Sequence, residues 1–243
     1  MERLQQADLH GHSCLSAELF GYRPGYRPAE IIQKAKEIGL DAVALTDHDT
    51  GRGLDEFLNA AANLGVIGIP GIEITSLSWS RPTNFRLPIA HILALGIKPE
   101  SINGKHPIPT GRTPEEVIDW IHDRGGLAIA AHPDRKYTSL SETEIRKLGN
   151  LNGLETLTLR GRIPEAELLA RELEIAAIAD TDFHDLRQMG FIGLTLLEEC
   201  TNWETVISAI ARNQIEVFEA LTIPYHLRGR RPFQLLIKAL LSR

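Results

Sequence analysis

The sequence predicts an α/β fold in which about seven strand–helix units form a closed or nearly closed (β/α) barrel. Short apolar runs alternate with segments of helical period along most of the chain. The run at residues 42–45 is apolar throughout, as expected for a parallel strand that is covered on both faces. A length of 243 residues suits one domain, and no linker-like or low-complexity segment divides the chain. We therefore favour a single barrel domain, residues 1–243, over an open doubly wound sheet.

The strands and helices are expected in a regular order. The expected strands are residues 6–12, 41–50, 66–75, 88–97, 126–135, 151–159, 175–185 and 215–221. The expected helices are residues 29–40, 54–65, 113–125, 141–149, 164–174 and 201–214. Pro28 suits a helix start and Gly39 a helix end, while Thr113 and Glu116 form the pattern of a capping box. We expect helices within residues 201–243 to close the barrel.

The charge and cysteine content restrict the class of protein. Lys and Arg total 26 and Asp and Glu total 32, a net charge of −6, which argues against stable binding to duplex DNA. Cys14 and Cys200 are far apart and give no disulfide framework. Without an apolar leader or an apolar run of membrane-spanning length, a cytoplasmic protein with no membrane segment is expected. The tail at residues 228–243, basic and then apolar, fits a closing helix; a helix for a membrane surface or a partner is the alternative.

The stretch ADLHGHS near the start of the chain carries the first chemical signal. In an extended strand, side chains two residues apart share a face, so Asp8, His10 and His12 would point the same way. Two imidazoles with a carboxylate behind them form a site that a divalent metal stabilises. The alternative is a chance pair of surface histidines.

Similar polar residues recur at the ends of later apolar strands. They are His10, His12, Asp47, His48, Asp49, Glu73, His91, His132, Asp180, Asp182 and His184. In a (β/α) barrel these ends converge on one face, where active sites are built. Burying so many ionisable groups together without a cation would be costly. The pattern therefore predicts a site with several metal ions, for which mixed imidazole and carboxylate ligands suit Zn, Mn or Fe.

The ordered set ADLHGHS, ALTDHDT, GIEIT, HILALGI, GGLAIAAHP and DTDFH resembles the polymerase and histidinol phosphatase (PHP) family of metal-dependent phosphoesterases. The resemblance is closest to the stand-alone nucleotide-phosphoesterase branch and spans residues 7–185. It implies a distorted (β/α)7 TIM-like barrel that holds two or three divalent metal ions, with Glu73 as a bridging ligand. The ligands that it implies are His10, His12, His48, Glu73, His91, His132, Asp182 and His184.

One position departs from the family pattern. Many members carry an Asp a few residues beyond the second His of the first motif, where this chain has Ala17. Either Glu18 takes its place or one metal site is incomplete. Three carboxylates fit best behind the ligands, where they would orient the histidines: Asp8, Asp47 and Asp49. We assign no metal to Asp180.

The resemblance implies hydrolysis of phosphomonoesters or phosphodiesters, of nucleotides or short oligonucleotides, by a metal-activated water. The sequence holds no nucleophile elbow and no glycine-rich phosphate loop, so no protein nucleophile is expected. Basic residues that follow two strand ends are candidates for binding the substrate phosphate: Arg135, Lys136, Arg160 and Arg162. Each of them could equally be a solvated loop charge. The loop YRPGYRP, with Tyr22, Arg23, Tyr26 and Arg27, could hold a base and phosphate by stacking and charge, or form a surface turn.

Three other functions stay open. A histidinol-phosphate phosphatase would share this site. A zinc amidohydrolase barrel also begins with His-x-His, but such sites usually bridge their metals with a strand-end Lys, and no strand here ends in one. A non-catalytic PHP scaffold is favoured mildly by Ala17 and disfavoured by the intact set of other ligands.

Overall fold

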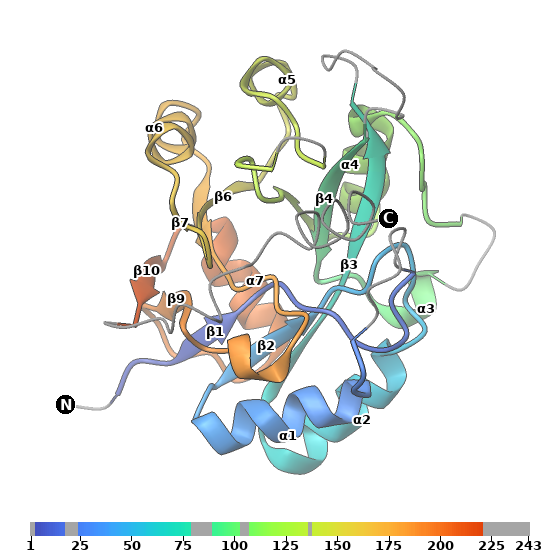
Figure 1. The fold of residues 1–243 in the computed structure, drawn as a ribbon, viewed down its shortest axis with the longest axis vertical. Coiled ribbons are helices and arrows are strands. Elements are labelled where there is room, and N and C mark those ends of the chain that lie inside the picture. The colour runs from blue at the N-terminus through green and yellow to red at the C-terminus, as the bar shows by residue number, and fades with distance from the viewer. Residues whose placement is uncertain (1–2, 18–23, 79–88, 103–106, 136–137, 221–243) are drawn as a thin grey trace, which may run out of the picture.

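One curled, mixed sheet forms the centre of the protein (Figure 1). The structure is a computed structural model and describes residues 3–17, 24–78, 89–102, 107–135 and 138–220. Its strands are β1 (Gln6–Asp8), β2 (Ala42–Leu45), β3 (Ile67–Leu77), β4 (Ile89–Leu95), β5 (Leu127–Ala130), β6 (Gly153–Thr158), β7 (Gly161–Arg162), β8 (Ala176–Ala179), β9 (Ile192–Leu196) and β10 (Ile215–Glu219). The order in the described sheet is β10-β9-β1-β2-β3-β4-β5-β6-β7, and β8 pairs with β6.

Helices lie on the outside of this sheet. They are α1 (Pro28–Ile38), α2 (Leu54–Leu64), α3 (Pro99–Ile102), α4 (Pro114–His122), α5 (Glu142–Lys147), α6 (Pro164–Glu172) and α7 (Trp203–Ala211), with a 3-10 turn at Leu186–Gln188. The predicted capping box is confirmed, because the Thr113 hydroxyl accepts from the Glu116 amide and the Glu116 carboxylate accepts from the Thr113 amide. Gly39 ends α1 with a φ of 76°, in the left-handed region that glycine adopts easily. None of the described helices has the length and apolar character of a membrane span.

The predicted α/β barrel class is confirmed, but the expectation of a parallel sheet is wrong in part. β1, β2 and β3 run parallel, as do β5, β6 and β8. β4 runs antiparallel to both of its neighbours, and β9 runs antiparallel to β1 and β10. A parallel pair needs a long crossover connection, and the consecutive parallel pairs β1–β2, β2–β3 and β5–β6 are each joined through a helix. The reversals at β4 and β9 distort the barrel.

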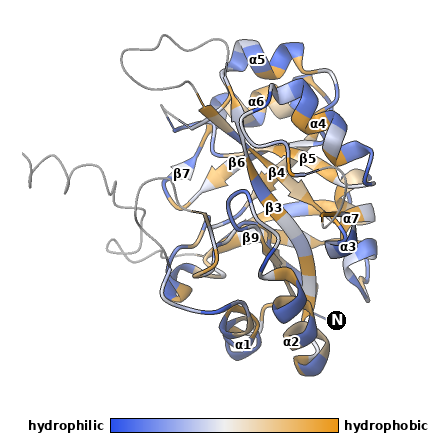
Figure 2. Ribbon diagram, turned by 90° about the vertical axis from the view of Figure 1, so that its right-hand side faces the viewer, coloured by the Kyte–Doolittle hydropathy of each residue, from blue (hydrophilic) through white to orange (hydrophobic). Residues whose placement is uncertain are grey.

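Strand β2 shows how the core is divided. Ala42 and Ala44 pack into the cluster that includes α7, while Val43 and Leu45 pack against α1 and α2 on the other face. This alternation follows the two-residue period of a strand and confirms that β2 is covered on both faces. Figure 2 shows the strands mostly in hydrophobic colours, with both colours on the surrounding helices.

The C-terminal part of the described chain adds to the same core. Helix α7 begins at Trp203, and the side-chain oxygen of its N-cap Asn202 accepts from the Thr205 amide. Its buried Val206 and Ile210 join the cluster beneath β1–β3. The predicted final strand is present as β10, which pairs with β9, a strand that was not expected from the sequence. The remaining residues of the expected closing helices, 221–243, lie outside the described residues.

Candidate metal centre

Two histidines of the first motif open a buried polar cluster at the carboxyl ends of the strands. His10 and His12 follow β1, are both buried, and their ring centroids lie 5.2 Å apart. Leu9, directly before His10, packs into the core, and Gly11 between the two histidines packs against Phe183. The alternation predicted for ADLHGHS therefore places both imidazoles on the face that the later motifs share.

Glu73 of β3 lies at the centre of the cluster. Its Oε2 atom lies 3.0 Å from His10 Nε2, 3.1 Å from His12 Nε2 and 3.2 Å from His48 Nδ1. His48 follows β2 and forms an isolated parallel bridge with Glu73. One carboxylate oxygen thus faces three imidazole nitrogens.

The other oxygen of Glu73 faces two further imidazoles. Its Oε1 atom lies 2.7 Å from Nδ1 of His91 in β4 and 2.9 Å from Nε2 of His132, which follows β5. The antiparallel pairing of β3 with β4 places Thr75 opposite His91 and so brings this imidazole beside Glu73. The two oxygens of one carboxylate therefore face two separate sets of donors, as a bridging ligand requires.

The segment after β8 completes the cluster. Asp182 Oδ1 lies 3.1 Å from His12 Nε2 and 3.4 Å from His10 Nε2. His184 Nδ1 lies 3.6 Å from the same oxygen, and its ring is 4.4 Å from that of His12. Phe183, between these two residues, turns into the core.

The donor set fits divalent cations. Donor atoms within 4.8 Å of one another form four overlapping groups among the described residues: His10, His12, Glu73 and Asp182; His48, Glu73 and His91; His12, His48 and His184; and His10, Glu155 and Asp180. His10 Nε2 and Glu73 Oε2 are buried and close but form no hydrogen bond. Buried polar atoms normally have a partner, so lone pairs that face one another in this way suit a shared cation.

Two of the imidazoles are held in the neutral form that binds metals. Burial and the Arg135 guanidinium lower the pKa of His132 to about 3. Burial also lowers the pKa of His48 well below its ordinary range, although the Glu73 carboxylate opposes the shift. Burial alone would raise the pKa of Glu73, but the neighbouring imidazoles outweigh it and hold that pKa well below its usual range. His10 differs from these two: burial would lower its pKa, but the Glu73 and Glu155 carboxylates outweigh burial and hold that pKa well above its ordinary range. The cluster therefore places neutral imidazoles of His48 and His132 beside the Glu73 carboxylate.

Asp8 has a different role from the one expected. Its carboxylate accepts from the Thr181 amide at 3.1 Å, the Thr181 hydroxyl at 2.7 Å and the Gly190 amide at 3.3 Å. These hydrogen bonds go to the chain after β8 and not to an imidazole. Asp8 therefore fixes the segment that carries Asp182, and the expectation that it would orient a histidine directly is corrected.

Asp47 and Asp49 also hold the backbone beside the ligands. Asp47 accepts from the amide and the hydroxyl of Ser13, each at 2.6 Å, directly after the first motif. Asp49 accepts from the amide and hydroxyl of Thr75 at 2.8 and 2.7 Å. For Asp49 the expected contact with a histidine is likewise replaced by contacts with β3. The carboxylates thus fix the strand-end segments.

One buried carboxylate of the cluster was missed in the sequence. Glu155 of β6 is buried, and its Oε1 atom lies 2.7 Å from His10 Nδ1. Most of the expected ligands follow a strand, but Glu155 lies within one, as Glu73 does. His91 also lies within its strand, near the amino end of β4, so the expectation that it stands at a carboxyl end is corrected. A lone acidic residue in the apolar run GLETLTL was the available signal. Asp180 lies near the same nitrogen, with Oδ1 at 3.7 Å.

The candidate phosphate-binding residues separate into two groups. The Arg135 guanidinium contacts the Asp182 carboxylate, and its side chain is 29% exposed, so it lies at the edge of the cluster. Arg160 Nη1 lies 3.4 Å from Asp134 Oδ2, and the Arg160 side chain is near Arg135. Arg162 pairs instead with carboxylates of α6 and β10, outside the cluster.

The structure describes Ser16 and Ala17, at the position where the chain departs from the family pattern. Ser16 Oγ accepts from the His48 amide at 2.9 Å, and the Ala17 amide donates to the His48 carbonyl at 3.2 Å. The position at which many PHP proteins carry an Asp therefore lies beside the cluster. Several other candidates lie outside the described residues: Glu18, Tyr22, Arg23 and Lys136.

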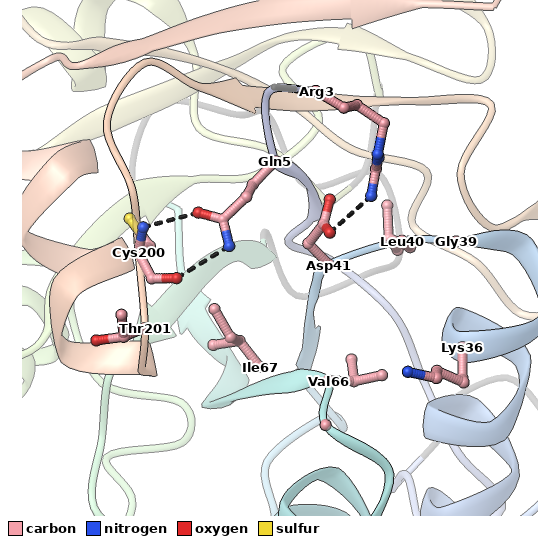
Figure 3. A pocket seen from close by; sticks show the side chains of 11 residues that line it. Arg3, Gln5, Lys36, Gly39, Leu40, Asp41, Val66, Ile67, Cys200 and Thr201 are labelled. Carbon is pink, nitrogen blue, oxygen red and sulfur yellow. Dashed lines mark hydrogen bonds and ion pairs between the residues drawn. The ribbon is translucent and has the colours of Figure 1, made fainter. Parts of the chain in front are cut away.

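Two hollows of about 370 Å³ each lie outside the ligand cluster. The first adjoins Asp49, next to the candidate ligand His48, and is also lined by Arg52, Ile102 and Thr110. The second hollow lies at the amino ends of β1–β3 (Figure 3), on the opposite side of the sheet from the candidate ligands. Beside it, Arg3 pairs with Asp41, and the Gln5 side chain bonds to the backbone of Cys200.

Comparisons with known proteins agree with this geometry. The sequence pattern of the PHP domain matches residues 8–130. An uncharacterized protein of Methanocaldococcus jannaschii is 32% identical over 133 residues, which cover 53% of this chain and 67% of that protein. A 3′,5′-nucleoside bisphosphate phosphatase of Chromobacterium violaceum is 39% identical over 92 residues, which cover 38% of this chain and only 28% of that enzyme.

A solved structure shares the fold. It is a two-domain protein of Bacteroides vulgatus, described as containing a predicted PHP-like metal-dependent phosphoesterase, with a TM-score of 0.68 and 17% identity. The match covers 90% of this chain and 65% of that one. At this identity the similarity concerns the fold alone.

Proposed function

The chain belongs to the PHP domain family, and on this premise we propose that it is a metal-dependent phosphoesterase that hydrolyses phosphate monoesters or diesters. The observation that carries the proposal is the position of Glu73, whose two oxygens face imidazoles on opposite sides. Such a carboxylate can hold two cations at once.

The candidate ligands form two groups, one for each of two cation positions. His10, His12 and Asp182 would share Glu73 Oε2 in the first position. His91 and His132, on the Oε1 side, would serve the second. A third group, in which His48 and His184 meet His12, would hold any further cation. When bound, divalent cations would polarise the phosphoryl group and acidify a water molecule.

Basic residues near the cluster support a phosphorylated substrate. Arg135 stands at the edge of the cluster and Arg160 lies near it, so both can face a bound phosphate. The hollow beside Asp49 is lined by the exposed Arg52 and would accommodate the rest of the substrate. The relative from Chromobacterium violaceum acts on nucleoside bisphosphates. Nucleotides or short oligonucleotides are therefore the substrates that we propose, with Zn, Mn or Fe as the metal.

A direct test combines metal analysis with hydrolysis assays. The purified protein would be analysed for bound metals and assayed with Mn²⁺ or Zn²⁺ on a nucleoside 3′,5′-bisphosphate, short RNA, histidinol phosphate and p-nitrophenyl phosphate. His132→Ala is expected to lose hydrolysis. His122→Ala is the matched control, because His122 in α4 bonds to Asn152 outside the cluster. The proposal fails if the protein takes up no transition metal, or if no phosphoester is hydrolysed.

The same panel separates the competing functions. Selective hydrolysis of histidinol phosphate would favour that phosphatase. The central bridging group is the carboxylate of Glu73, where amidohydrolase sites usually have a Lys, which weighs against the amidohydrolase alternative. Metal binding without any hydrolysis would favour the scaffold.

A further inference from the structure

Glu155 is a buried carboxylate between two of the candidate ligands. Its strand β6 contributes apolar side chains to the core on both faces, with Leu154 in one cluster and Leu157 in another. The Glu155 side chain is 0% exposed. A carboxylate so deeply buried needs hydrogen-bond donors, and two candidate ligands, His10 and His132, supply them.

The first donor is the ring of His10. His10 Nδ1 lies 2.7 Å from Glu155 Oε1, so the Nδ1–H group donates to this oxygen. The other ring nitrogen, Nε2, then carries the lone pair and faces Glu73 at 3.0 Å and Asp182 at 3.4 Å. Glu155 thus selects the tautomer of His10 that presents a ligand atom toward the bridging carboxylate.

The second donor is the backbone of His132. Its amide donates to Glu155 Oε2 at 2.6 Å. His132 has a φ of 29°, a conformation that non-glycine residues rarely adopt and that needs support from its surroundings. In this conformation its Nε2 lies 2.9 Å from Glu73 Oε1, on the opposite side of the bridge from His10.

We propose that Glu155 is a positioning residue that sets the ligand geometry on both sides of Glu73. One of its oxygens orients the imidazole of His10 and the other holds the backbone from which His132 reaches the bridge. The inference rests on the proposed function, because it concerns the same metal centre. It adds a residue that contacts two ligands without being a ligand itself.

The substitution Glu155→Gln tests this role with little change in volume. Glutamine has one acceptor oxygen, so it cannot accept from both the His10 ring and the His132 amide. The matched control is Glu144→Gln, because Glu144 of α5 is equally buried but bonds to Ser78 and Ser141. Thermal unfolding of both variants measures the purely structural cost of removing a buried charge.

The deciding measurements are metal affinity by calorimetry and the visible spectrum of the Co²⁺-loaded protein. Glu155→Gln is expected to bind Mn²⁺ or Zn²⁺ roughly 10- to 100-fold more weakly and to change the Co²⁺ spectrum. Glu144→Gln should match the parent in both. Parental affinity and an unchanged spectrum in Glu155→Gln would overturn the inference. So would loss of one whole metal equivalent with the others unchanged, because Glu155 would then be a ligand.

The failure of this inference can be told from the failure of the proposed function. If the parent protein binds metal but hydrolyses no phosphoester, the proposed function fails. The inference would still be upheld by weaker metal binding in Glu155→Gln. If the parent hydrolyses phosphoesters and Glu155→Gln binds metal as the parent does, the positioning role fails alone.

Discussion

Gly11 packs directly against the ring of Phe183: a Cβ atom on this glycine would lie 1.9 Å from a ring carbon. Two backbone hydrogen bonds join the same segments, from the His12 amide to the Phe183 carbonyl at 3.1 Å and from the Phe183 amide to the His10 carbonyl at 3.3 Å. The first motif therefore packs against, and hydrogen-bonds to, the segment that carries Asp182. Only glycine fits between the two histidines.

Gly11→Ala should accordingly push the two segments apart. We expect a loss of about 1–3 kcal/mol in the free energy of unfolding, as for other overpacked sites, together with weaker metal binding. Urea unfolding and metal titration would measure both. Gly149→Ala is the control, since a Cβ there meets no atom within 4 Å. A Gly11→Ala protein with the stability and metal affinity of the parent would contradict this packing.

The ion pair between α1 and α2 gives a pH-dependent prediction away from the metal centre. Hydrogen bonds from Arg27, at 2.6 and 3.0 Å, lower the pKa of Glu56 below its ordinary value. A lowered pKa in the folded state means that the contribution is present above the unfolded pKa and is lost as the pH falls through the folded one. Glu56→Gln should therefore unfold at slightly lower urea concentration than the parent at neutral pH. The difference should vanish in acid; a difference that stays constant with pH would exclude this origin.

Much of the candidate site was predictable because most of its candidate ligands stand at strand ends. His10, His48 and His132 interrupt or follow apolar runs, so their positions at strand ends can be recognised from the sequence alone. The antiparallel direction of β4 was not predictable, because the alternation of apolar residues is the same in either direction. Strand direction depends on which neighbours pair, which is a property of the whole sheet.

The roles of the supporting carboxylates were harder to predict than the ligands. Asp8 precedes His10 by two residues, yet its hydrogen bonds go to Thr181 and Gly190, far along the chain. Glu155 contacts His10 from a strand that is distant in sequence. When a carboxylate bonds to residues far away in the sequence, no local sequence pattern indicates its role. Only the three-dimensional structure identifies that role.

The two-sided position of Glu73 predicts how its loss differs from the loss of one histidine. Glu73→Ala should abolish metal binding at both positions, because both groups of donors face this carboxylate. His91→Ala should keep the metal on the His10 side, since His91 lies only on the Oε1 side. Metal content after gel filtration would distinguish the two variants. Equal loss in both would argue against two positions that share one bridge.

Removal of the metal should also destabilise the protein. A ligand present at about 100 times its dissociation constant stabilises the folded state by about 2.7 kcal/mol, so a chelator should lower the thermal midpoint measurably. Glu73→Ala should unfold at the same temperature with and without the chelator. A parent protein that is insensitive to chelation would show that the cluster does not need a cation to fold.

Arg135 and Arg162 provide a matched pair for testing the phosphate-binding role. The Arg135 guanidinium lies against the Asp182 carboxylate at the edge of the cluster, whereas Arg162 pairs with Glu167 at 2.9 Å on the outside of the sheet. A hydrogen bond to a charged group is worth about 1.5–3 kcal/mol, so Arg135→Ala should raise the KM for a phosphoester roughly tenfold or more. Arg162→Ala should leave KM unchanged. Since Arg135 also touches a candidate ligand, metal content must be measured in parallel. A raised KM at full metal occupancy would support a direct contact with the substrate. An unchanged KM would remove Arg135 from the phosphate site.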